Sequence, residues 1–224
     1  MIAFNIMTTS ELPYLKNLIP QLAIMGDEIY VVDSGSNDGT WEWLNDNIKN
    51  YPLHLYRRDY DWNEANQRNF ILNNTPDKCY VMRIDADELP TIKLRDSLKG
   101  ILNNSIDRAY LRIFNLHKDL KHIDSIAGFQ MRLWWKDNNC KWMDKTHARI
   151  DGSFNRECID IHPTMSLMHF KFLDKDKYDP KDYFANGAYA KEHFNILKNP
   201  EHIIELPETV QYDVSDELKR FLNL

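Results

Sequence analysis

Acidic side chains gather in one short stretch of the sequence, RIDADE, which runs from Arg83 to Glu88. Asp85, Asp87 and Glu88 would repel one another there unless a positive charge neutralised them. A divalent cation does so, and oxygen ligands suit Mg²⁺ or Mn²⁺. The spacing predicts a metal site with Asp87 as the direct ligand and Asp85 contacting the metal or a bound substrate. The alternative is an acidic loop that caps a helix near Thr91.

A second polar cluster, VVDSGSNDGT, runs from Val31 to Thr40. Asp33 ends an apolar run, and its carboxylate could accept hydrogen bonds from a base or from ribose hydroxyls. Gly35 and Gly39 allow a sharp turn and a close approach of the backbone to a ligand. Asp38 is placed to cap the next helix. The alternative is a plain junction between a strand and a helix.

A third motif, WNEANQRNF, lies between the other two, from Trp62 to Phe70. Arg68 falls on the helix that leads towards the acidic stretch. Its guanidinium could pair with a phosphate or with a base carbonyl. The alternative is a surface ion pair with Glu64, four residues earlier on the same helix.

These motifs need a scaffold that brings the ends of strands together. Short apolar runs predict four buried strands, at Ile2 to Met7, Glu28 to Val32, Leu53 to Tyr56 and Tyr80 to Ile84. Helices are predicted between them, after an N-cap at Ser10, at Thr40 to Ile48 and at Asn63 to Leu72. This alternation favours a parallel sheet with helices on both faces. Its strands then present their carboxyl ends at one edge, where ligands bind.

The second half of the chain has a different pattern. It predicts strands at Ala109 to Asn115 and Ala127 to Trp135, followed by short β pieces and then a helix. The β pieces are expected at His147 to Ile150, Cys158 to Ile161 and Leu167 to Phe172, and the helix from Pro180 to about Leu197. No linker divides the chain into independent domains.

Composition narrows the classes of function. The chain has 224 residues, a net charge of −6 and a pI of about 5.7, so it lacks the basic footprint of a nucleic-acid binder. Its three cysteines, Cys79, Cys140 and Cys158, contain no Cys-x-x-Cys pair, which fits a reducing compartment. The first residues do not resemble a signal peptide, and no stretch approaches the roughly 18 apolar residues of a spanning helix. We expect a cytoplasmic protein, with membrane contact at most peripheral.

The order VVDSGSNDGT, WNEANQRNF and VMRIDADE resembles the inverting family 2 glycosyltransferases of the GT-A fold. The resemblance covers roughly residues 1–172. It implies an α/β fold in which a Rossmann-like, mostly parallel sheet with helices on both faces continues into a mixed or antiparallel acceptor half. The implied domain is 1–175, with a nucleotide-binding half (1–90) and an acceptor half (91–175). A helical extension would follow at 176–224.

The resemblance also implies a nucleotide-sugar donor, with UDP as the first choice, and Mn²⁺ or Mg²⁺ as cofactor. The acceptor would be a glycan, a lipid-linked glycan or another hydroxyl compound. The donor-binding residues carried over from the family are at the starts and ends of the motifs: Thr8, Glu11, Asp33, Ser34, Gly35, Asp38, Arg68, Asp85 and Ala86. Nucleic acid is not an expected partner, and the sequence indicates no oligomeric state.

In the second half, RLWWKDNNCKWMDKTHARI resembles a family segment that ends in W-x-G-x-V-H-E. Arg132, Leu133, Trp142 and His147 match it, whereas Ala148 stands where the family has glutamate. The acidic group expected near the acceptor is therefore missing or displaced. We take Asp144 as the first candidate for the catalytic base and His147 as the second, although both could be structural.

His169, near the end of the second half, resembles the histidine that completes the metal shell in many GT-A enzymes. The alternative interpretation is that His169 is a structural residue of the core. A nucleotidyltransferase is a rival reading, but TTSELP follows the first strand where a glycine-rich phosphate loop would be expected. A second alternative is a carbohydrate- or nucleotide-binding module that is derived from a transferase and has lost catalysis. The presence of Ala148 in place of the family's glutamate is consistent with this alternative. A transferase that modifies a nucleic-acid base or a protein side chain is a third.

Overall fold

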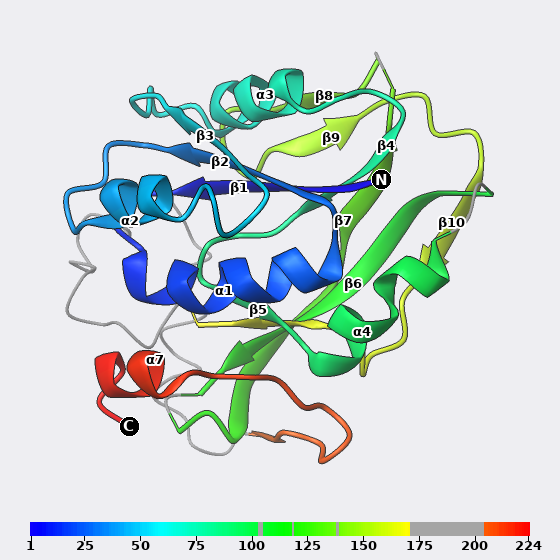
Figure 1. Cartoon of the computed structure of the whole chain (residues 1–224). Helices are drawn as coiled ribbons and strands as arrows, with labels where there is room; N and C mark the ends of the chain where they lie inside the picture. The colour runs from blue at the N-terminus through cyan, green and yellow to red at the C-terminus, as the bar shows by residue number, and fades with distance from the viewer. Residues whose placement is uncertain (103–104, 118, 138, 171–203) are drawn as a thin grey trace.

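The computed structural model describes residues 1–102, 105–117, 119–137, 139–170 and 204–224. Its centre is a mixed ten-stranded sheet in which β3, β2, β1, β4, β7, β6, β11 and β5 lie side by side in that order (Figure 1). Two further strands, β10 and β12, pair with β6 and β7. The predicted α/β class and its mixed sheet are confirmed.

The first four strands in the chain form the parallel half of the sheet. They are β1 (Ile2–Thr8), β2 (Glu28–Asp33), β3 (Leu53–Arg57) and β4 (Cys79–Arg83). Each was predicted from an apolar run, since a parallel strand is buried on both faces. Thr8 is in register with Asp33, and Asp33 with Arg57. The carboxyl ends of three neighbouring strands therefore bring these side chains to one edge.

Helices cover both faces of this half. One face carries α1 (Leu12–Met25), α2 (Thr40–Asp46) and α4 (Ile92–Ile101), whose apolar residues join the larger core with those of β1. The opposite face carries α3 (Glu64–Asn74) and the hairpin of β8 (Lys141–Met143) and β9 (Arg149–Asp151), which enclose the smaller core (Figure 1). The predicted helices on both faces are present.

The start of α1 differs from the prediction. Ser10 is not the N-cap, because its φ is +55° and Glu11 occupies that position. The carboxylate of Asp38 binds here instead, accepting from the backbone N–H of Leu12 at 3.1 Å. Its other oxygen accepts from the N–H of Thr40 at 3.1 Å, although Gly39, and not Asp38, is the N-cap residue of α2. Asp38 thus ties the starts of two helices together.

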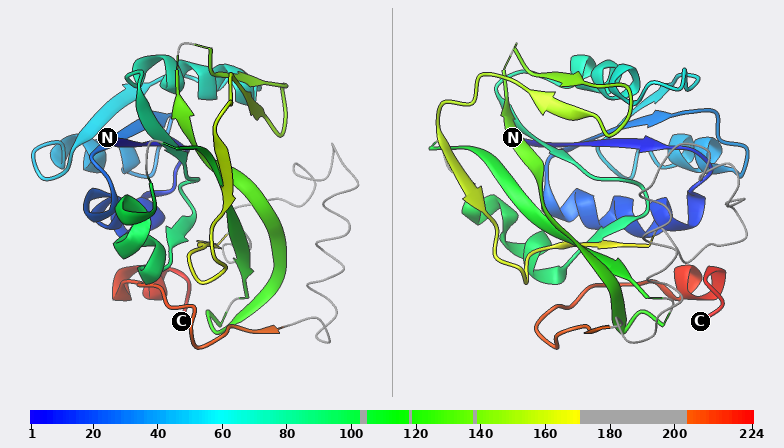
Figure 2. Two further views of the ribbon diagram at one scale, coloured as in Figure 1. Left: turned by 90° about the vertical axis from the view of Figure 1, so that its right-hand side faces the viewer. Right: turned by 180° about the vertical axis from the view of Figure 1, so that it is seen from behind.

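The second half of the sheet is largely antiparallel. β7 (His122–Lys136) joins it to β4, and β6 (Ile106–Leu116) pairs with β7 along most of its length. These two strands form a long curved ribbon (Figure 2) and extend beyond the predicted spans. The short strands β5 (Glu88–Pro90), β10 (Glu157–Asp160) and β11 (Leu167–His169) complete this half.

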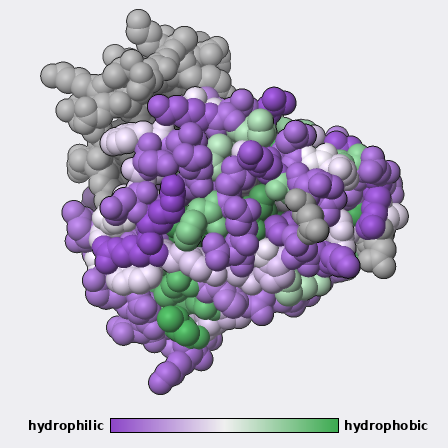
Figure 3. Space-filling model, turned by 90° about the horizontal axis from the view of Figure 1, so that it is seen from above, coloured by the Kyte–Doolittle hydropathy of each residue, from purple (hydrophilic) through white to green (hydrophobic). Residues whose placement is uncertain are grey.

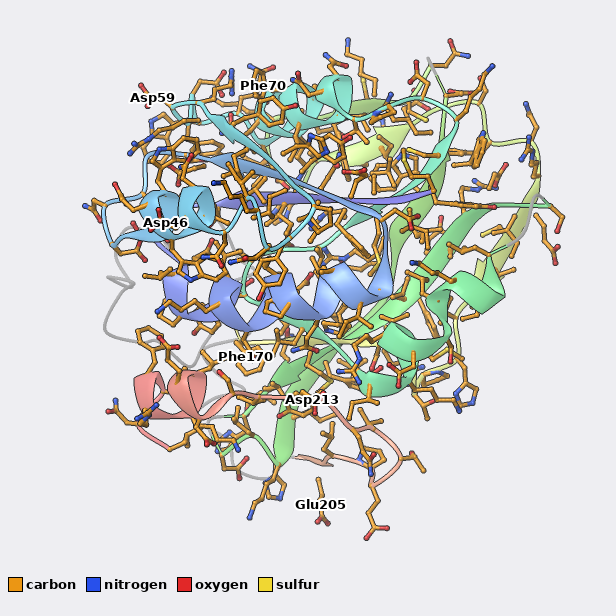
Figure 4. The ribbon with its side chains drawn as sticks, in the orientation of Figure 1. Asp46, Asp59, Phe70, Phe170, Glu205 and Asp213 are labelled. Atoms are coloured by element: carbon orange, nitrogen blue, oxygen red, sulfur yellow. The ribbon has the colours of Figure 1, made fainter. Side chains whose placement is uncertain are left out.

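The end of the chain packs back onto the main core. β12 (Ile204–Glu205) pairs with β7, and α7 (Asp216–Phe221) lies beside α1. Phe170 lies between α1 and this segment (Figure 4), with its ring centroid 5.9 Å from Tyr14 and 6.3 Å from Tyr212. The helix predicted at 180–197 and the boundary predicted after residue 175 lie outside the described residues.

None of the helices in the described part of the chain has the length and apolar character that crossing a membrane requires.

One close approach fixes how α1 leads into β2. A Cβ built on Gly26 would lie 2.2 Å from Cε2 of Phe4, whose side chain is fully buried. We expect Gly26→Ala to lower the free energy of unfolding by about 1–3 kcal/mol, because an overpacked core must shift. In Gly100→Ala, where no atom lies within 4 Å, the change should be neutral or a gain of up to about 1 kcal/mol. Urea unfolding of both variants measures the contrast, and equal stabilities would contradict the packing described.

Candidate functional site

Asp33 lies at the carboxyl edge of the parallel strands and is completely buried. Its carboxylate accepts from the backbone N–H of Ser36 at 3.1 Å and from the Ser36 hydroxyl. Nε of Arg57 lies 3.3 Å from its Oδ2, and the Arg57 guanidinium stands over the ring of Trp41 at 5.4 Å. Asp33 therefore holds the turn after β2 and an arginine that is itself partly exposed.

The turn after β2 is open to solvent. The backbone N–H of Ser34 donates to the carbonyl of Thr8 at 2.9 Å, and the Ser34 hydroxyl accepts from the amide of Gln67 at 2.9 Å. Gly35 has a φ of +97° and no atom within 4 Å of a built Cβ. The backbone at Gly35 therefore adopts a conformation that favours glycine and has open space beside it, and ligand binding there stays a prediction.

Asp85 is bound by three arginines from three different elements. Nη2 of Arg68 on α3 lies 3.2 Å from Oδ1, while Nη2 of Arg83 on β4 and Nη1 of Arg132 on β7 lie 3.1 and 3.2 Å from Oδ2. Burial alone would raise the pKa of Asp85, but the arginines hold it well below its usual range. Asp85 is therefore ionised, and both of its oxygens are engaged.

Two glutamates complete the charge balance of this cluster. Glu88 is buried, accepts from Nη2 of Arg132 at 2.6 Å and binds the backbone N–H of Asp85 at 2.9 Å. Glu64 accepts from Nε of Arg68 at 2.6 Å. Arg68 thus makes the i, i+4 pair with Glu64 that was the alternative prediction, and it reaches Asp85 as well.

Asp87 faces away from the arginines and towards His169. The antiparallel pairing of β5 with β11 places His169 opposite Glu88, next to Asp87. Nε2 of His169 lies 3.3 Å from Oδ2 of Asp87, and both side chains are partly exposed, at 16% and 15%. Nδ1 of His169 lies 2.7 Å from Oδ1 of Asn115, which accepts its hydrogen bond, and Nε2 is thereby turned towards Asp87.

This pair fits a divalent cation that takes the rest of its shell from water and substrate phosphate. The pairing of an imidazole oriented by an amide with a carboxylate is the donor set expected of such a site. Among the described residues no group of three or more His, Cys, Asp or Glu is arranged to hold a metal. The hydroxyl of Thr91 caps α4 at Leu94, so the acidic loop does not serve as that cap.

Glu11 is a second acidic group close to Asp87. Its Oε2 accepts from the Thr8 hydroxyl at 3.0 Å and from the Thr9 N–H at 3.2 Å. Burial, followed by the negative charge of Asp87, raises the pKa of Glu11 to about 8. Glu11 therefore resists ionisation beside Asp87, and a bound cation would relieve that repulsion. Ala86, in the loop after β4, is buried.

The two candidate bases lie on the loop that joins β8 and β9. Asp144 and His147 both have positive φ, at +73° and +54°. The carboxylate of Asp144 is half-exposed and pairs with Nε of Arg149 at 2.9 Å. His147 lines a pocket of about 380 Å³, and Asp144 is not among the residues that line it. The geometry favours His147 over Asp144 as the group that faces a bound acceptor.

Sequence reasoning passed over several residues of the site. Arg57 ends β3 at the same edge as Asp33 and could have been found by the rule that selected Asp33 and Asp85. Arg83 belongs to the acidic motif, but no sequence pattern predicts that it pairs with Asp85. Arg132 was noticed only through the family pattern, because its ion pairs join strands distant in the sequence.

One protein family matches most of the sequence. Residues 6–176 match the family described as Glycosyl transferase family 2. Because the match spans most of the chain, the protein belongs to that family. A comparison with curated proteins gives no match.

Among solved structures, residues 1–349 of S. aureus TarS resemble the chain with 19% identity and a TM-score of 0.45. The alignment covers 52% of this chain and 36% of that one. The same protein in complex with UDP-GlcNAc aligns with 16% identity and a TM-score of 0.46, over 52% of this chain and 35% of that one. The chain thus aligns with about a third of that structure.

The buried pair of Arg132 and Glu88 allows a test of the arginine cluster. Arg132→Met leaves the Glu88 carboxylate buried without its closest partner, so we expect the free energy of unfolding to fall by about 3–5 kcal/mol at neutral pH. The double variant with Glu88→Gln should recover much of this loss, because no buried charge is then left unpaired. Urea denaturation of the wild type, the two single variants and the double variant completes a double-mutant cycle for Arg132 and Glu88. Wild-type stability of Arg132→Met would contradict the arrangement.

Glu11 predicts a dependence of stability on pH. Its carboxyl keeps a proton to about pH 8 in the folded protein, against about pH 4.5 when unfolded. Between these values the folded state binds more protons, so the free energy of unfolding falls as the pH rises. Glu11→Gln removes this contribution. The Tm of the variant minus the Tm of the wild type should therefore increase from pH 5 to pH 8 in metal-free buffer. A constant difference in Tm across this range would exclude the raised pKa.

Proposed function

We propose that the protein is a metal-dependent glycosyltransferase, which moves a sugar from a nucleotide-diphosphate donor to an acceptor hydroxyl with inversion. Membership of the family supports transfer of a sugar. The observation that carries the metal requirement is the pair of Asp87 and His169, set beside the arginine-bound Asp85 at the carboxyl end of β4. UDP-sugars are the donors to test first, on the resemblance of the motifs.

The strand ends supply the donor site in this proposal. Arg57, held by Asp33 and partly exposed, contacts the base or the ribose. Asp85 is ionised and 29% exposed, so its carboxylate can accept from ribose hydroxyls while the arginines fix its position. Asp33 is completely buried with its oxygens engaged, and we assign it the role of holding Arg57 and the turn after β2 rather than direct binding.

Asp87 and His169 are the residues that would hold Mn²⁺ or Mg²⁺. The bound ion would supply a Lewis acid that stabilises the negative charge developing on the leaving diphosphate. Asp85 is not part of this pair in the proposal, because its oxygens are bound by arginines. Arg68 and Arg83 add positive potential on the same side of the site.

The acceptor hydroxyl attacks the anomeric carbon from the face opposite the diphosphate, which inverts the configuration. We assign the removal of its proton to His147, since this imidazole lines the pocket, whereas Asp144 does not line it and is paired with Arg149. A neutral imidazole is a suitable base near neutral pH. The family match favours this reading over a nucleotidyltransferase or a binding module.

The test is a thermal-shift titration of UDP and UDP-sugars with and without Mn²⁺. A ligand bound only by the folded state raises Tm by mass action, by about 5–10 °C at a concentration near 100 Kd for a chain of this size. We expect a shift that needs both diphosphate and metal. Asp87→Ala and His169→Ala should each lose most of it.

Asp144→Asn serves as the control and should keep the full shift, because Asp144 lies on the β8–β9 loop. Two results would contradict the proposal: no diphosphate shifts the wild type under any metal condition, or Asp87→Ala shifts as the wild type does.

A further inference from the structure

The pocket between α3 and the β8–β9 hairpin has a mixed lining. Its volume is about 380 Å³, within the range of small-molecule sites. The polar groups that line it are carried by Glu64, Arg83, Gln130, His147 and Arg149, and Trp142 contributes an apolar wall. The face of the molecule that carries α3 and this hairpin is mostly hydrophilic, with separate small apolar areas (Figure 3).

Glu64 is the carboxylate of this pocket, and three hydrogen bonds fix it. Its backbone N–H donates to the carbonyl of Lys145 at 2.9 Å, and its Oε2 accepts from the backbone N–H of Ala148 at 3.1 Å. Its Oε1 accepts from Nε of Arg68 at 2.6 Å. Burial alone would raise the pKa of Glu64, but Arg68 and the Ala148 N–H lower it, so the carboxylate is ionised at neutral pH.

The pocket adjoins the Asp85 cluster through two arginines. Arg68 and Arg83 stand over the ring of Trp142 at 5.3 and 5.7 Å, and each also pairs with Asp85. Because Arg83 lines the pocket and also pairs with Asp85, a ligand in the pocket lies next to the Asp85 cluster at the proposed donor edge.

The chemistry of the lining selects the kind of ligand. Both arginines of the lining are already paired with aspartates, Arg83 with Asp85 and Arg149 with Asp144. The wall also carries the ionised carboxylate of Glu64, so an anion such as a second phosphate is disfavoured. Vicinal hydroxyls can donate to Glu64 while accepting from Arg83 and Gln130, and an apolar ring face can lie against Trp142. A neutral saccharide ring satisfies all of these groups together.

We propose that Glu64 supplies the carboxylate that binds the acceptor, a neutral saccharide, in this pocket; the inference rests on the proposed glycosyl transfer. Ala148 has only a methyl group at the position where the family pattern has glutamate, and its backbone N–H binds Glu64 instead. The acidic group near the acceptor thus comes from the first turn of α3 rather than from the hairpin.

The experiment follows the indole N–H signals of the six tryptophans by NMR, with Trp142→Phe used only to assign the signal of Trp142. UDP and diamagnetic Mg²⁺ are added first, followed by methyl glycosides of glucose, galactose and N-acetylglucosamine in separate titrations. In the wild type, at least one glycoside should move the Trp142 signal. Glu64→Gln keeps the shape of the side chain and should weaken that binding about 10- to 100-fold, as loss of a hydrogen bond to a charged group implies.

Glu42→Gln is the matched control, since Glu42 also lies in the first turn of a helix but is exposed on α2, and it should bind as the wild type does. Both variants should keep the response to UDP and Mg²⁺. The inference is overturned if the wild type responds to UDP but no glycoside moves the Trp142 signal, or if Glu64→Gln binds the glycoside as tightly as the wild type. Absence of any response to UDP and Mg²⁺ would instead overturn the proposed function on which the inference rests.

Discussion

The binding of Asp85 by three arginines is the interaction on which the rest of the site depends. Arg68, Arg83 and Arg132 come from α3, β4 and β7, so one carboxylate joins the helix on one face, the central parallel strand and the first antiparallel strand. Glu88 and Glu64 balance the remaining positive charge. Buried arginines of this kind are stable only with such partners, and the loop after β4 is therefore fixed in position.

This interaction divides the acidic motif into two parts with different chemistry. Asp85 faces the arginines and is ionised, whereas Asp87, two residues later, faces His169. The strand pairing of β5 with β11 holds that division, because the backbone N–H of Phe170 donates to the carbonyl of Asp87 at 2.9 Å. In the proposed function, Asp85 binds hydroxyls and Asp87 binds the cation, so the two carboxylates lie close together without competing for the same charge.

Apolar runs were enough to predict the four parallel strands and their helices, and with them the edge where Asp33 and Asp85 lie. Residues paired across the antiparallel half were harder to predict, because their partners are distant in sequence. Asn115, which orients His169, and Arg132 have meaning only once β6, β7 and β11 are placed beside each other. The role of Glu64 likewise depends on a hairpin about eighty residues later.

The most direct test is a crystal structure of the protein with UDP and Mn²⁺, with the metal located by its anomalous scattering. The account predicts one strong Mn²⁺ peak bonded to Oδ2 of Asp87 and Nε2 of His169, with the diphosphate in its remaining positions. Asp85 should still be bound by its three arginines. A Mn²⁺ ion bonded to Asp85 with the arginines displaced, or a diphosphate bound away from Asp87, would contradict it.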